Sequence, residues 1–369
     1  MEKTNKFIAV TISTIILIFS IWFIFNEKKE FSDNEFRYLQ KFPELNAQDL
    51  IDGKYISNLE KYFTDHFPLR ETFVSLKTQI YYSSGLNLIN DIYIAKDNFL
   101  INKFSKPINN DKIINIINNF KKNNKELNVS ILLSPTATSI YENLLPKHNI
   151  NYSEKEAIDY YYKNLNINTI NVYDEMINQK NNYQLFYKTD HHWTSFGAYI
   201  AYQEFLKNQN KYYIPLTELE IEIVSEEFLG TLYSKVFTKN QEKDKIHKIN
   251  TKENDFTVKY LTKTTNTLYE ENFLKEKDKY SYFLNTNQGI IEITNNNIDN
   301  NDEILIIKDS FANSFIPLLA NHYKKIHVID LRYYMLPISS YVQENNIKDV
   351  LLLYNINTLD TDTGIITLR

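Results

Sequence analysis

The chain has 369 residues and a formal net charge of −5, from 41 Lys and Arg against 46 Asp and Glu, which argues against a nucleic-acid partner because polyanion binding needs a basic surface. It has no cysteine, which excludes disulfide scaffolds, thiolate metal sites, cysteine nucleophiles and iron–sulfur clusters. With 43% hydrophobic residues, a chain of this length can bury one large core or two ordinary ones.

The first predicted element is an apolar N-terminal helix. Residues 7–25 carry no charge, and at about 1.5 Å per residue they span about 28 Å, close to the hydrocarbon thickness of a bilayer. Lys3 and Lys6 precede the helix, so the positive-inside rule places the first residues in the cytoplasm and the rest of the chain outside. A retained anchor over 1–26 is favoured over a cleaved signal peptide, because the bulky Phe-Ile-Phe at its end does not suit a cleavage site.

Helical segments follow the anchor and form a predicted stalk or collar over residues 27–90. Apolar residues at helical spacing predict helices over 46–63 and 69–84, and Gly85 is placed as a C-cap beyond the second one. A β-hairpin is then expected around the turn 96–98.

From residue 91 onward, short apolar runs alternate with amphipathic helices, which is typical of a parallel sheet covered by helices. The expected strands are 129–133, 169–173, 184–187, 304–307, 326–329 and 350–354. The expected helices are 112–122, 154–165 with Ser153 as N-cap, 196–207 and a short one after Ser314. We therefore predict an α/β protein, a three-layer α/β/α sandwich with a parallel central sheet over 91–369. A β-rich insertion is expected at about 239–301, where the helical spacing disappears.

Two segments carry the residues best suited to chemistry. Asp190 and His192 lie between a predicted strand and a predicted helix, and Ser310 follows the apolar strand 304–307. Loops of this kind are where α/β sheets keep their active sites. A serine so placed is exposed near helix N–H donors, which suits a nucleophile whose intermediate needs an oxyanion hole. Together the segments supply a Ser, a His and an Asp.

The Asp-His-His-Trp sequence at 190–193 resembles the defining motif of the DHHW proteins of Gram-positive bacteria, related to the AlgJ- and AlgX-like alginate O-acetyltransferases. Segments 32–37, 65–70, 228–232 and 330–334 are similar to that group as well. The resemblance implies an SGNH hydrolase-like fold with Asp190 as orienting acid, His192 as base and Ser310 as nucleophile. It also implies an acetyl donor delivered by a membrane-bound O-acyltransferase partner.

Residues beside these three have weaker assignments. Asn313 is a candidate oxyanion donor, and Phe311 is a candidate substrate contact beside it. His191 is expected to be structural, because the pattern Asp-x-His selects the following histidine. Trp193 fits the core and the acyl pocket equally well. The serine block reads Lys-Asp-Ser, whereas typical SGNH enzymes have Gly-Asp-Ser, so the sequence leaves the oxyanion hole unassigned.

Thr136, Arg332 and a metal site each have an alternative interpretation. Thr136 fits a site loop or a plain turn equally well. Arg332 could make a bidentate substrate contact, but a structural ion pair in the collar or below the sheet is the simpler interpretation. A metal at the Asp-His-His triplet is disfavoured, because the sequence has no further acidic ligands or Gly-rich histidine motif beside it. We expect no metal and no cofactor.

Three functions remain open. The leading one is a membrane-anchored, extracytoplasmic O-acetyltransferase that acts on a cell-envelope polysaccharide through a Ser-His-Asp acyl-enzyme. An acetylesterase of the same fold would share the acyl-enzyme and differ only in admitting water. A non-catalytic glycan-binding or assembly subunit would use its aromatic surfaces instead.

Overall fold

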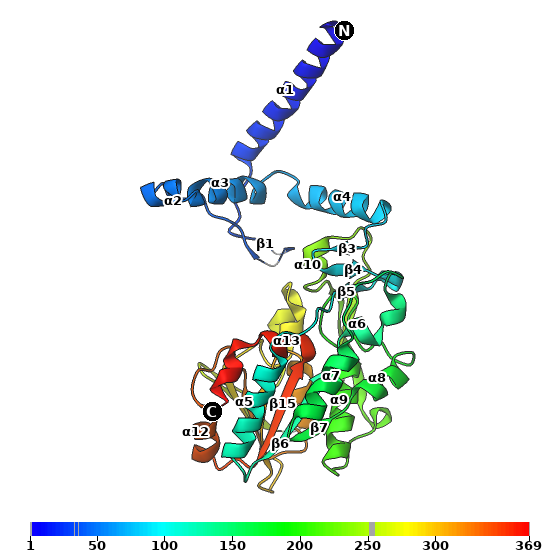
Figure 1. The fold of residues 1–369 in the computed structure, drawn as a ribbon, viewed down its shortest axis with the longest axis vertical. Helices are drawn as coiled ribbons and strands as arrows, with labels where there is room; N and C mark the ends of the chain where they lie inside the picture. The colour runs from blue at the N-terminus through cyan, green and yellow to red at the C-terminus, as the bar shows by residue number, and fades with distance from the viewer. Residues whose placement is uncertain (1, 33, 36, 251–254, 369) are drawn as a thin grey trace. The chain divides into compact units, whose positions relative to one another are not determined.

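The structure, a computed structural model, describes residues 2–32, 34–35, 37–250 and 255–368. The chain divides into two compact units. The first unit comprises Met1–Leu86 and Ser234–Asn240, and the second comprises Asn87–Tyr233 and Gln241–Arg369. The elements are labelled in Figure 1.

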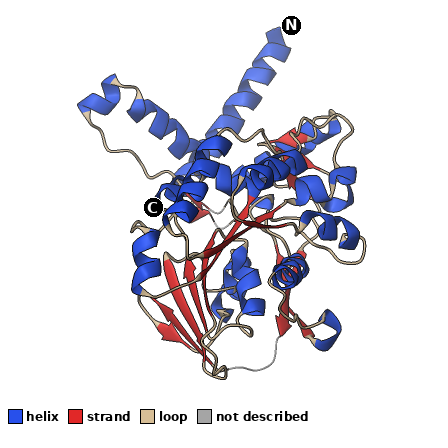
Figure 2. Ribbon diagram, turned by 60° about the horizontal axis from the view of Figure 1, so that its bottom comes forward, coloured by secondary structure: helices blue, strands red, loops and turns tan. Residues whose placement is uncertain are grey.

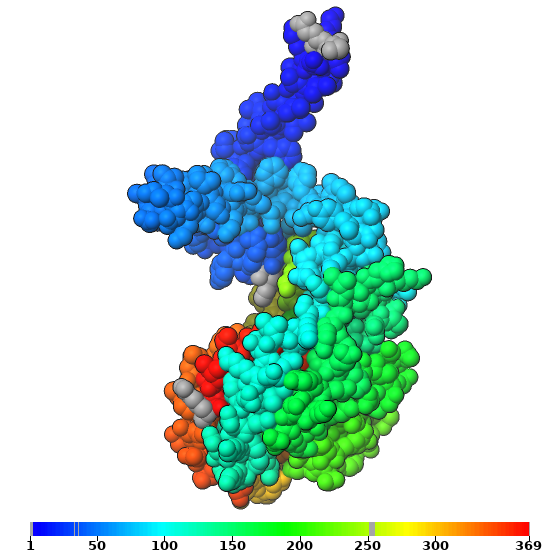
Figure 3. Space-filling model, in the orientation of Figure 1, coloured from blue at the N-terminus to red at the C-terminus, as the bar shows by residue number. Residues whose placement is uncertain are grey.

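The first unit is helical. Its elements are α1 (Glu2–Phe25), the paired strands β1 (Phe31–Ser32) and β2 (Arg37–Tyr38), α2 (Ala47–Ile51), α3 (Lys54–Asp65) and α4 (Arg70–Ser83). Helix α1 is long and apolar enough to cross a membrane, and its apolar residues are not buried; in Figure 3 its outer part stands clear of other atoms. The single helix expected over 46–63 is wrong, because Gly53, with φ of 73°, breaks it into α2 and α3. Gly85, with φ of 87°, follows the end of α4 as expected of a C-cap.

An ion-pair network joins two of the segments that carry the family resemblance. Arg37 pairs with Glu35 and with Asp65 at 2.8 and 2.5 Å, and Arg70 pairs with Glu35 at 2.7 Å. Burial would raise the Asp65 pKa, but the hydrogen bonds from Arg37 and from the Gln40 backbone outweigh it and lower the pKa. Asp33 and Phe36 of the same segment lie outside the described residues. The network therefore fixes the chain after α1 against the end of α3.

The second unit is built on one eight-stranded sheet in the order β11-β10-β12-β14-β13-β15-β6-β7. The strands are β6 (Asn128–Ser134), β7 (Asn168–Ile170), β10 (Phe256–Tyr260), β11 (Thr264–Thr265), β12 (Ile290–Asn295), β13 (Glu303–Lys308), β14 (Lys325–Ile329) and β15 (Asp349–Asn355). Strands β14, β13, β15, β6 and β7 are parallel, whereas β12, β10 and β11 pair antiparallel. The predicted parallel central sheet is therefore confirmed, and strands β10, β11 and β12 of the insertion expected at about 239–301 extend it antiparallel at one edge.

Helices cover both faces of this sheet, as Figure 2 shows. Along β13, Ile304 and Ile306 belong to one core, whereas Leu305 and Ile307 belong to the other. The first core is shared with α9 (Ser195–Asn208), α11 (Ala312–Leu319), α6 (Ala137–Ile140) and α8 (Tyr173–Gln179). The second is shared with α5 (Asn110–Asn123), α7 (Glu154–Asn164), α12 (Ile338–Glu344) and α13 (Ile356–Thr361). Because successive strand residues point to opposite faces, this alternation confirms the three-layer α/β/α sandwich.

Smaller sheets complete the fold. The expected hairpin is present as β4 (Ile92–Ile94) and β5 (Leu100–Asn102), with β3 (Leu88–Ile89) added at its side. Strands β8 (Glu220–Phe228) and β9 (Asp244–Asn250) form an antiparallel pair. In the chain, the short helix α10 (Tyr233–Val236) follows β8 and precedes β9. The strand expected at 184–187 is wrong: this segment makes only an isolated bridge between Phe186 and Trp193, because it turns back on itself before α9.

The sheet core gives a test of the fold. Ile306 of β13 is fully buried, whereas Ile366 is 54% exposed. Replacing Ile306 by Ala should lower the free energy of unfolding by about 2–5 kcal/mol, since a cavity is left between the sheet and its helices. The matched substitution Ile366→Ala should change it by less than about 0.5 kcal/mol. Urea unfolding of both variants measures this, and equal losses would contradict the assigned core.

Candidate active site

The site lies at the carboxyl edge of the parallel strands. Ser310 follows the end of β13, Asp330 follows β14, and Asn355 ends β15. Asp190 and His192 come from the loop that the Phe186–Trp193 bridge closes, just before α9. Thr194 caps α9 by accepting hydrogen bonds from the N–H groups of its first turn, so the loop ends at a fixed position.

Asp190, His192 and Ser310 form one chain of hydrogen bonds. The Nδ1 of His192 lies 2.6 Å from Asp190 Oδ1, and its Nε2 lies 2.7 Å from Ser310 Oγ. An ionised carboxylate can only accept, so His192 Nδ1 carries the proton and donates to it. The Nε2 atom is then the acceptor and the Ser310 hydroxyl donates to it. The arrangement leaves Ser310 Oγ next to a base that is already in the correct tautomer.

Asp190 is held from its other side by the segment after β8. Its Oδ2 accepts hydrogen bonds from Thr231 N at 2.8 Å and from Thr231 Oγ1 at 2.9 Å. A side chain on the preceding residue, Gly230, would place its Cβ 2.3 Å from the Asp190 Cβ, so only glycine fits there. Burial alone would raise the Asp190 pKa, but the charges of the His191 and His192 rings and the hydrogen bonds from His192 and Thr231 hold it well below its usual range.

The turn that carries Ser310 is fixed by Asp309. This side chain is fully buried; its Oδ1 accepts from Phe311 N at 2.9 Å, and its Oδ2 accepts from Asn355 N and Nδ2 at 2.8 and 2.7 Å. Burial raises the pKa of Asp309. All of its contacts go to the backbone and to β15, so Asp309 ties the serine turn to the neighbouring strand and does not touch His192.

Trp193 and Tyr280 join the histidine loop to the serine turn. The fully buried Trp193 donates its indole N–H to Phe311 O at 2.8 Å and to Ser314 Oγ at 3.0 Å. The sequence fitted Trp193 to the core and to the acyl pocket equally well, and in the structure it lies in the core. The Tyr280 ring lies flat on the His192 ring, with centroids 3.8 Å apart and 9° between planes, and its hydroxyl donates to Ser310 O at 3.1 Å. No motif marks Tyr280 as a site residue, because it lies in the insertion, away from the histidine and serine segments.

A buried lysine occupies the place where the typical block has glycine. Lys308 Nζ donates to Asn313 Oδ1 at 2.7 Å and to Asn287 Oδ1 at 2.9 Å, and it lies 3.5 Å from Asp330 Oδ2. Arg332 binds the same Asp330 carboxylate with two nitrogens, at 2.8 and 2.6 Å. Burial lowers the pKa of Lys308 to about 8, although the charge of Asp330 acts in the opposite direction.

The Lys308 network corrects the expectation for Arg332. An ion pair was expected, and Arg332 does pair with Asp330. The pair follows β14, so it lies at the carboxyl edge with Ser310, neither below the sheet nor in the collar. The network also orients Asn313: because Lys308 can only donate, the amide of Asn313 presents Oδ1 to it, and Nδ2 is left with one long contact of 3.4 Å to Asn287.

The remaining predicted residues divide into two groups. Phe311 is buried beside His192, with ring centroids 5.3 Å apart. His191 Nδ1 lies 2.8 Å from Thr231 Oγ1, so it supports the residue that holds Asp190. Thr136, in contrast, is not brought to the triad: its side chain bonds to Glu154 Oε1 at 2.5 Å and to Thr138. It caps α6, which matches the turn interpretation.

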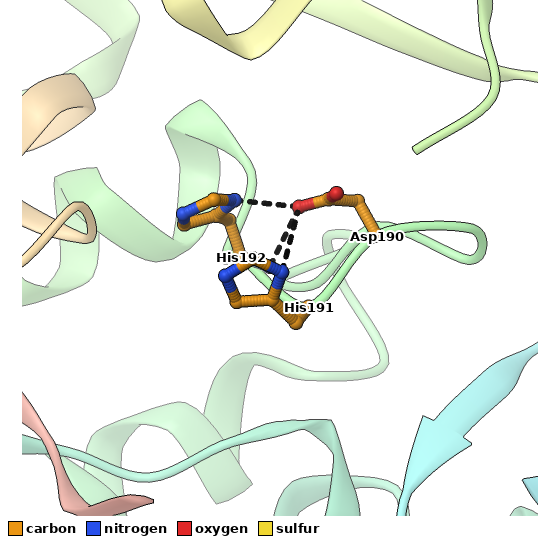
Figure 4. Close-up of side chains that lie close together, drawn as sticks. All are labelled: Asp190, His191 and His192. Atoms are coloured by element: carbon orange, nitrogen blue, oxygen red, sulfur yellow. Dashed lines mark hydrogen bonds and ion pairs between the residues drawn. The ribbon is translucent and has the colours of Figure 1, made fainter. Parts of the chain in front are cut away.

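Asp190, His191 and His192 also have the chemistry of a possible metal site. One ligand atom from each lies within 4.8 Å of the others, and no other group of this kind is found among the described residues. In Figure 4, the dashed lines from both histidines converge on a single Asp190 oxygen. Both oxygens of Asp190 already accept hydrogen bonds from His192 and Thr231. A cation there would have to displace the proton on His192 Nδ1, so the contacts fit a hydrogen-bonded acid–base pair better than a metal site.

The buried Lys308 predicts a pH-dependent contribution to stability. Its folded pKa of about 8 lies below the usual 10.5, so between these pH values the folded state binds fewer protons than the unfolded chain, and stability rises with pH in that window. The urea midpoint of the wild type minus that of Lys308→Met should therefore increase from pH 8 to 10.5, because only the wild type gains stability from the lysine in this window. The exposed control Lys259→Met should show no such trend. A flat difference for Lys308→Met would refute the lowered pKa.

Comparison with known proteins bears out the fold. A crystal structure of a DHHW family protein from Eubacterium siraeum is similar, with a TM-score of 0.63 and 24% identity, over 73% of this chain and 91% of that chain. Bacillus cereus PatB1 gives a TM-score of 0.63 and 24% identity, over 74% of this chain and 98% of that chain. A second PatB1 structure, with a sulfonyl adduct, gives 0.61 and 23%, over 75% and 99%.

More distant likenesses add context. The O-acetyltransferase domain of Pseudomonas putida AlgJ has a TM-score of 0.46 and 13% identity, over 73% of this chain and 92% of that chain. The comparison with curated proteins finds no match. The family described as DHHW protein matches residues 83–329, which include the histidine loop and the serine turn. The suspected relationship is therefore confirmed, and the chain belongs to the DHHW protein family.

Proposed function

We propose that this protein is a membrane-anchored, extracytoplasmic O-acetyltransferase that transfers acetyl groups to hydroxyls of a cell-envelope polysaccharide through an acyl-enzyme on Ser310. The observation that carries the proposal is the chain of hydrogen bonds from Asp190 through His192 to Ser310, at 2.6 and 2.7 Å. A serine that only ended a strand or capped a helix would not need a histidine on its hydroxyl and a buried carboxylate behind that histidine.

The first half-reaction loads the serine. Ser310 Oγ attacks the carbonyl carbon of an acetyl donor while its proton moves to His192 Nε2. The tetrahedral intermediate collapses, the bond to the leaving oxygen breaks, and His192 returns the proton to that oxygen. Asp190 stabilises the imidazolium during this step, because its pKa lies well below the usual range and the carboxyl is ionised.

The second half-reaction transfers the acetyl group from Ser310 to the acceptor. A polysaccharide hydroxyl gives its proton to His192 Nε2 and attacks the acetyl carbon, and the bond to Ser310 Oγ breaks as that oxygen takes the proton back. The acetyl ester is then on the sugar, and the enzyme is unchanged. If water attacked instead, the same residues would release acetate, which is the esterase alternative.

Two donors are suited to the oxyanion. No hydrogen bond among the described residues uses the Ser310 N–H, so it can donate to the negative oxygen of the tetrahedral intermediate. The Lys308 contact turns Asn313 Nδ2, in the first turn of α11, away from the lysine, and its contact of 3.4 Å with Asn287 is long, so Nδ2 is the second candidate donor. Preorganised donors of this kind contribute about 3 kcal/mol each in other acyl-transfer enzymes.

Location and partners follow from the chain's organisation. Residues 1–26 are proposed as the anchor, 27–90 as the collar and 91–369 as the catalytic part, outside the cytoplasm. The sequence resemblance to alginate O-acetyltransferases supports acetyl as the group and a polysaccharide as the acceptor. Acetyl-CoA is cytoplasmic, so the donor is proposed to arrive through a membrane-bound O-acyltransferase partner.

The acyl-enzyme can be tested by mass. Full-length protein in detergent, incubated with p-nitrophenyl acetate, should gain the mass of one acetyl group, and Ser310→Ala should gain none. Ester hydrolysis by Ser310→Ala or His192→Ala should fall on the order of 10³-fold or more. The exposed serine variant Ser83→Ala serves as a matched control, and EDTA should leave the wild type unaffected.

The result also separates the competing functions. An adduct that requires Ser310, followed by transfer to an added oligosaccharide, supports the transferase, whereas release to water alone supports the esterase. Because PatB1 was solved with a sulfonyl adduct, a sulfonyl fluoride is a second probe for the same serine. A folded wild type that forms neither adduct would overturn the catalytic proposal in favour of a glycan-binding or assembly role.

Thr231 gives a test of the support behind the base. Thr231→Val keeps the shape and the backbone N–H but removes the hydroxyl that donates to Asp190 Oδ2 at 2.9 Å. The loss of a hydrogen bond to a charged group costs about 1.5–3 kcal/mol. We expect kcat for ester hydrolysis to fall about 10- to 100-fold with KM unchanged. Thr231→Ser should restore most of it, and equal rates for wild type and Thr231→Val would exclude this positioning role.

A further inference from the structure

Helix α4 carries an exposed apolar stripe. Leu69, the residue before the helix, and Phe73, Leu76 and Ile80 within it recur at intervals of four, three and four residues, which places the last three on one helix face. Their exposed fractions are 49, 45, 48 and 56%. The opposite face is the one that packs within the unit, because Thr78 is buried and donates to Val236 O at 2.5 Å. The apolar stripe therefore stays largely exposed, apart from the ring contacts of Phe73.

Helix α3 repeats this arrangement. Ile56 and Phe63 are 56% and 47% exposed and lie on one face, with the half-buried Leu59 between them. The other face carries charged side chains, including Lys54 and Lys61. Contiguous exposed apolar surface of this kind is rare on a water-soluble protein and indicates an interaction surface. We call the exposed faces of α3 and α4 together the apolar collar face.

Ring contacts join this face to α1. Phe19 of α1 stacks on Phe67, with centroids 5.2 Å apart, and contacts Phe73 at 6.2 Å. Phe23 of α1 contacts Phe63 at 5.2 Å. Figure 1 shows α3 and α4 running crosswise at the C-terminal end of α1. Phe19 lies six residues before the end of α1, which is about 9 Å along the helix axis. When α1 crosses a bilayer, rings at this level lie within its outer boundary.

We infer that α3 and α4 lie flat in the outer headgroup layer of the membrane that α1 crosses, with the apolar collar face inserted at the boundary of the acyl chains. Amphipathic helices bind bilayers in this way, with their apolar side buried about 5–10 Å and their charged side in water. The inference rests on the proposed anchoring by α1. It adds a second membrane contact, so that the first unit is held by a surface as well as by one helix.

Lipid is the occupant that the contacts favour. The residues that cover part of the face belong to the apolar helix α1, so the uncovered remainder is continuous with a lipid-facing surface. Three of the four charged residues of α3, Lys54, Lys61 and Asp65, lie on the side away from Ile56 and Phe63, as the boundary between acyl chains and water requires. The fourth, the exposed Glu60, lies at the edge of the apolar face. A protein partner would have to cover both the exposed stripe of α4 and the adjoining apolar surface of α1.

The absence of cysteine makes a direct test possible. Single cysteines at Leu76 and Ile80, on the apolar collar face, are labelled with an environment-sensitive fluorophore in the full chain. Ser75→Cys on the other side of α4 is the matched control, and Ile15→Cys reports on α1 itself. The proteins are reconstituted in vesicles of phosphatidylcholine and phosphatidylglycerol that carry a quencher on the lipid chains.

The inference predicts that labels at 76 and 80 lose roughly half of their fluorescence to the lipid quencher, as the label at 15 does, while the label at 75 does not. Quenching at 15 without quenching at 76 and 80 would overturn the inference and leave the anchor intact. A blue shift at 76 and 80 without lipid quenching would mean that a second copy of the chain covers the face, which also overturns it. No quenching at 15 would remove the anchor and the inference together.

Discussion

The site depends on one buried carboxylate that has to stay charged. Asp190 is almost fully buried, and burial alone would favour its neutral form. Hydrogen bonds to both carboxylate oxygens, from His192 on one side and from Thr231 on the other, offset this unfavourable burial. The close approach of Thr231 is possible because Gly230 has no side chain. Since a charged Asp190 can only accept hydrogen bonds, it fixes the tautomer of His192 and so determines which nitrogen faces Ser310.

The serine turn is fixed by a second set of buried polar groups. Asp309 ties it to β15 through Asn355, and Lys308 ties it to Asn313, Asn287 and Asp330. Strand alternation explains why two neighbouring residues can do this, because Lys308 and Asp309 point to opposite sides of the sheet. Tyr280 and Trp193 then join this turn to the histidine loop. The charged groups of the site are thus satisfied before any substrate is bound.

The two units serve the proposed reaction in different ways. The second unit supplies the chemistry at the carboxyl edge of a sheet, where parallel strands bring loops from distant parts of the chain together. The first unit is proposed to supply the location, through α1 and the apolar collar face. Its ion pairs among Glu35, Arg37, Asp65 and Arg70 hold the segment after α1 in place. The proposed transfer, from a membrane protein to an envelope polymer, uses both units.

The sequence by itself determined the local patterns: the apolar helix α1, the strands of the parallel core, the caps at Ser153 and Gly85, and the Asp-x-His and Ser segments at the ends of elements. These follow from periodicity and residue chemistry, which are properties of neighbouring residues. Only the tertiary structure decided that 184–187 is not a strand, that β12, β10 and β11 extend the sheet antiparallel, and that Thr231, Tyr280 and Lys308 surround the site. Those outcomes depend on contacts between residues tens of positions apart, and His192 and Ser310 are themselves separated by 118 residues. No local pattern encodes such distances, because they are set by how strands and loops pack around a shared core.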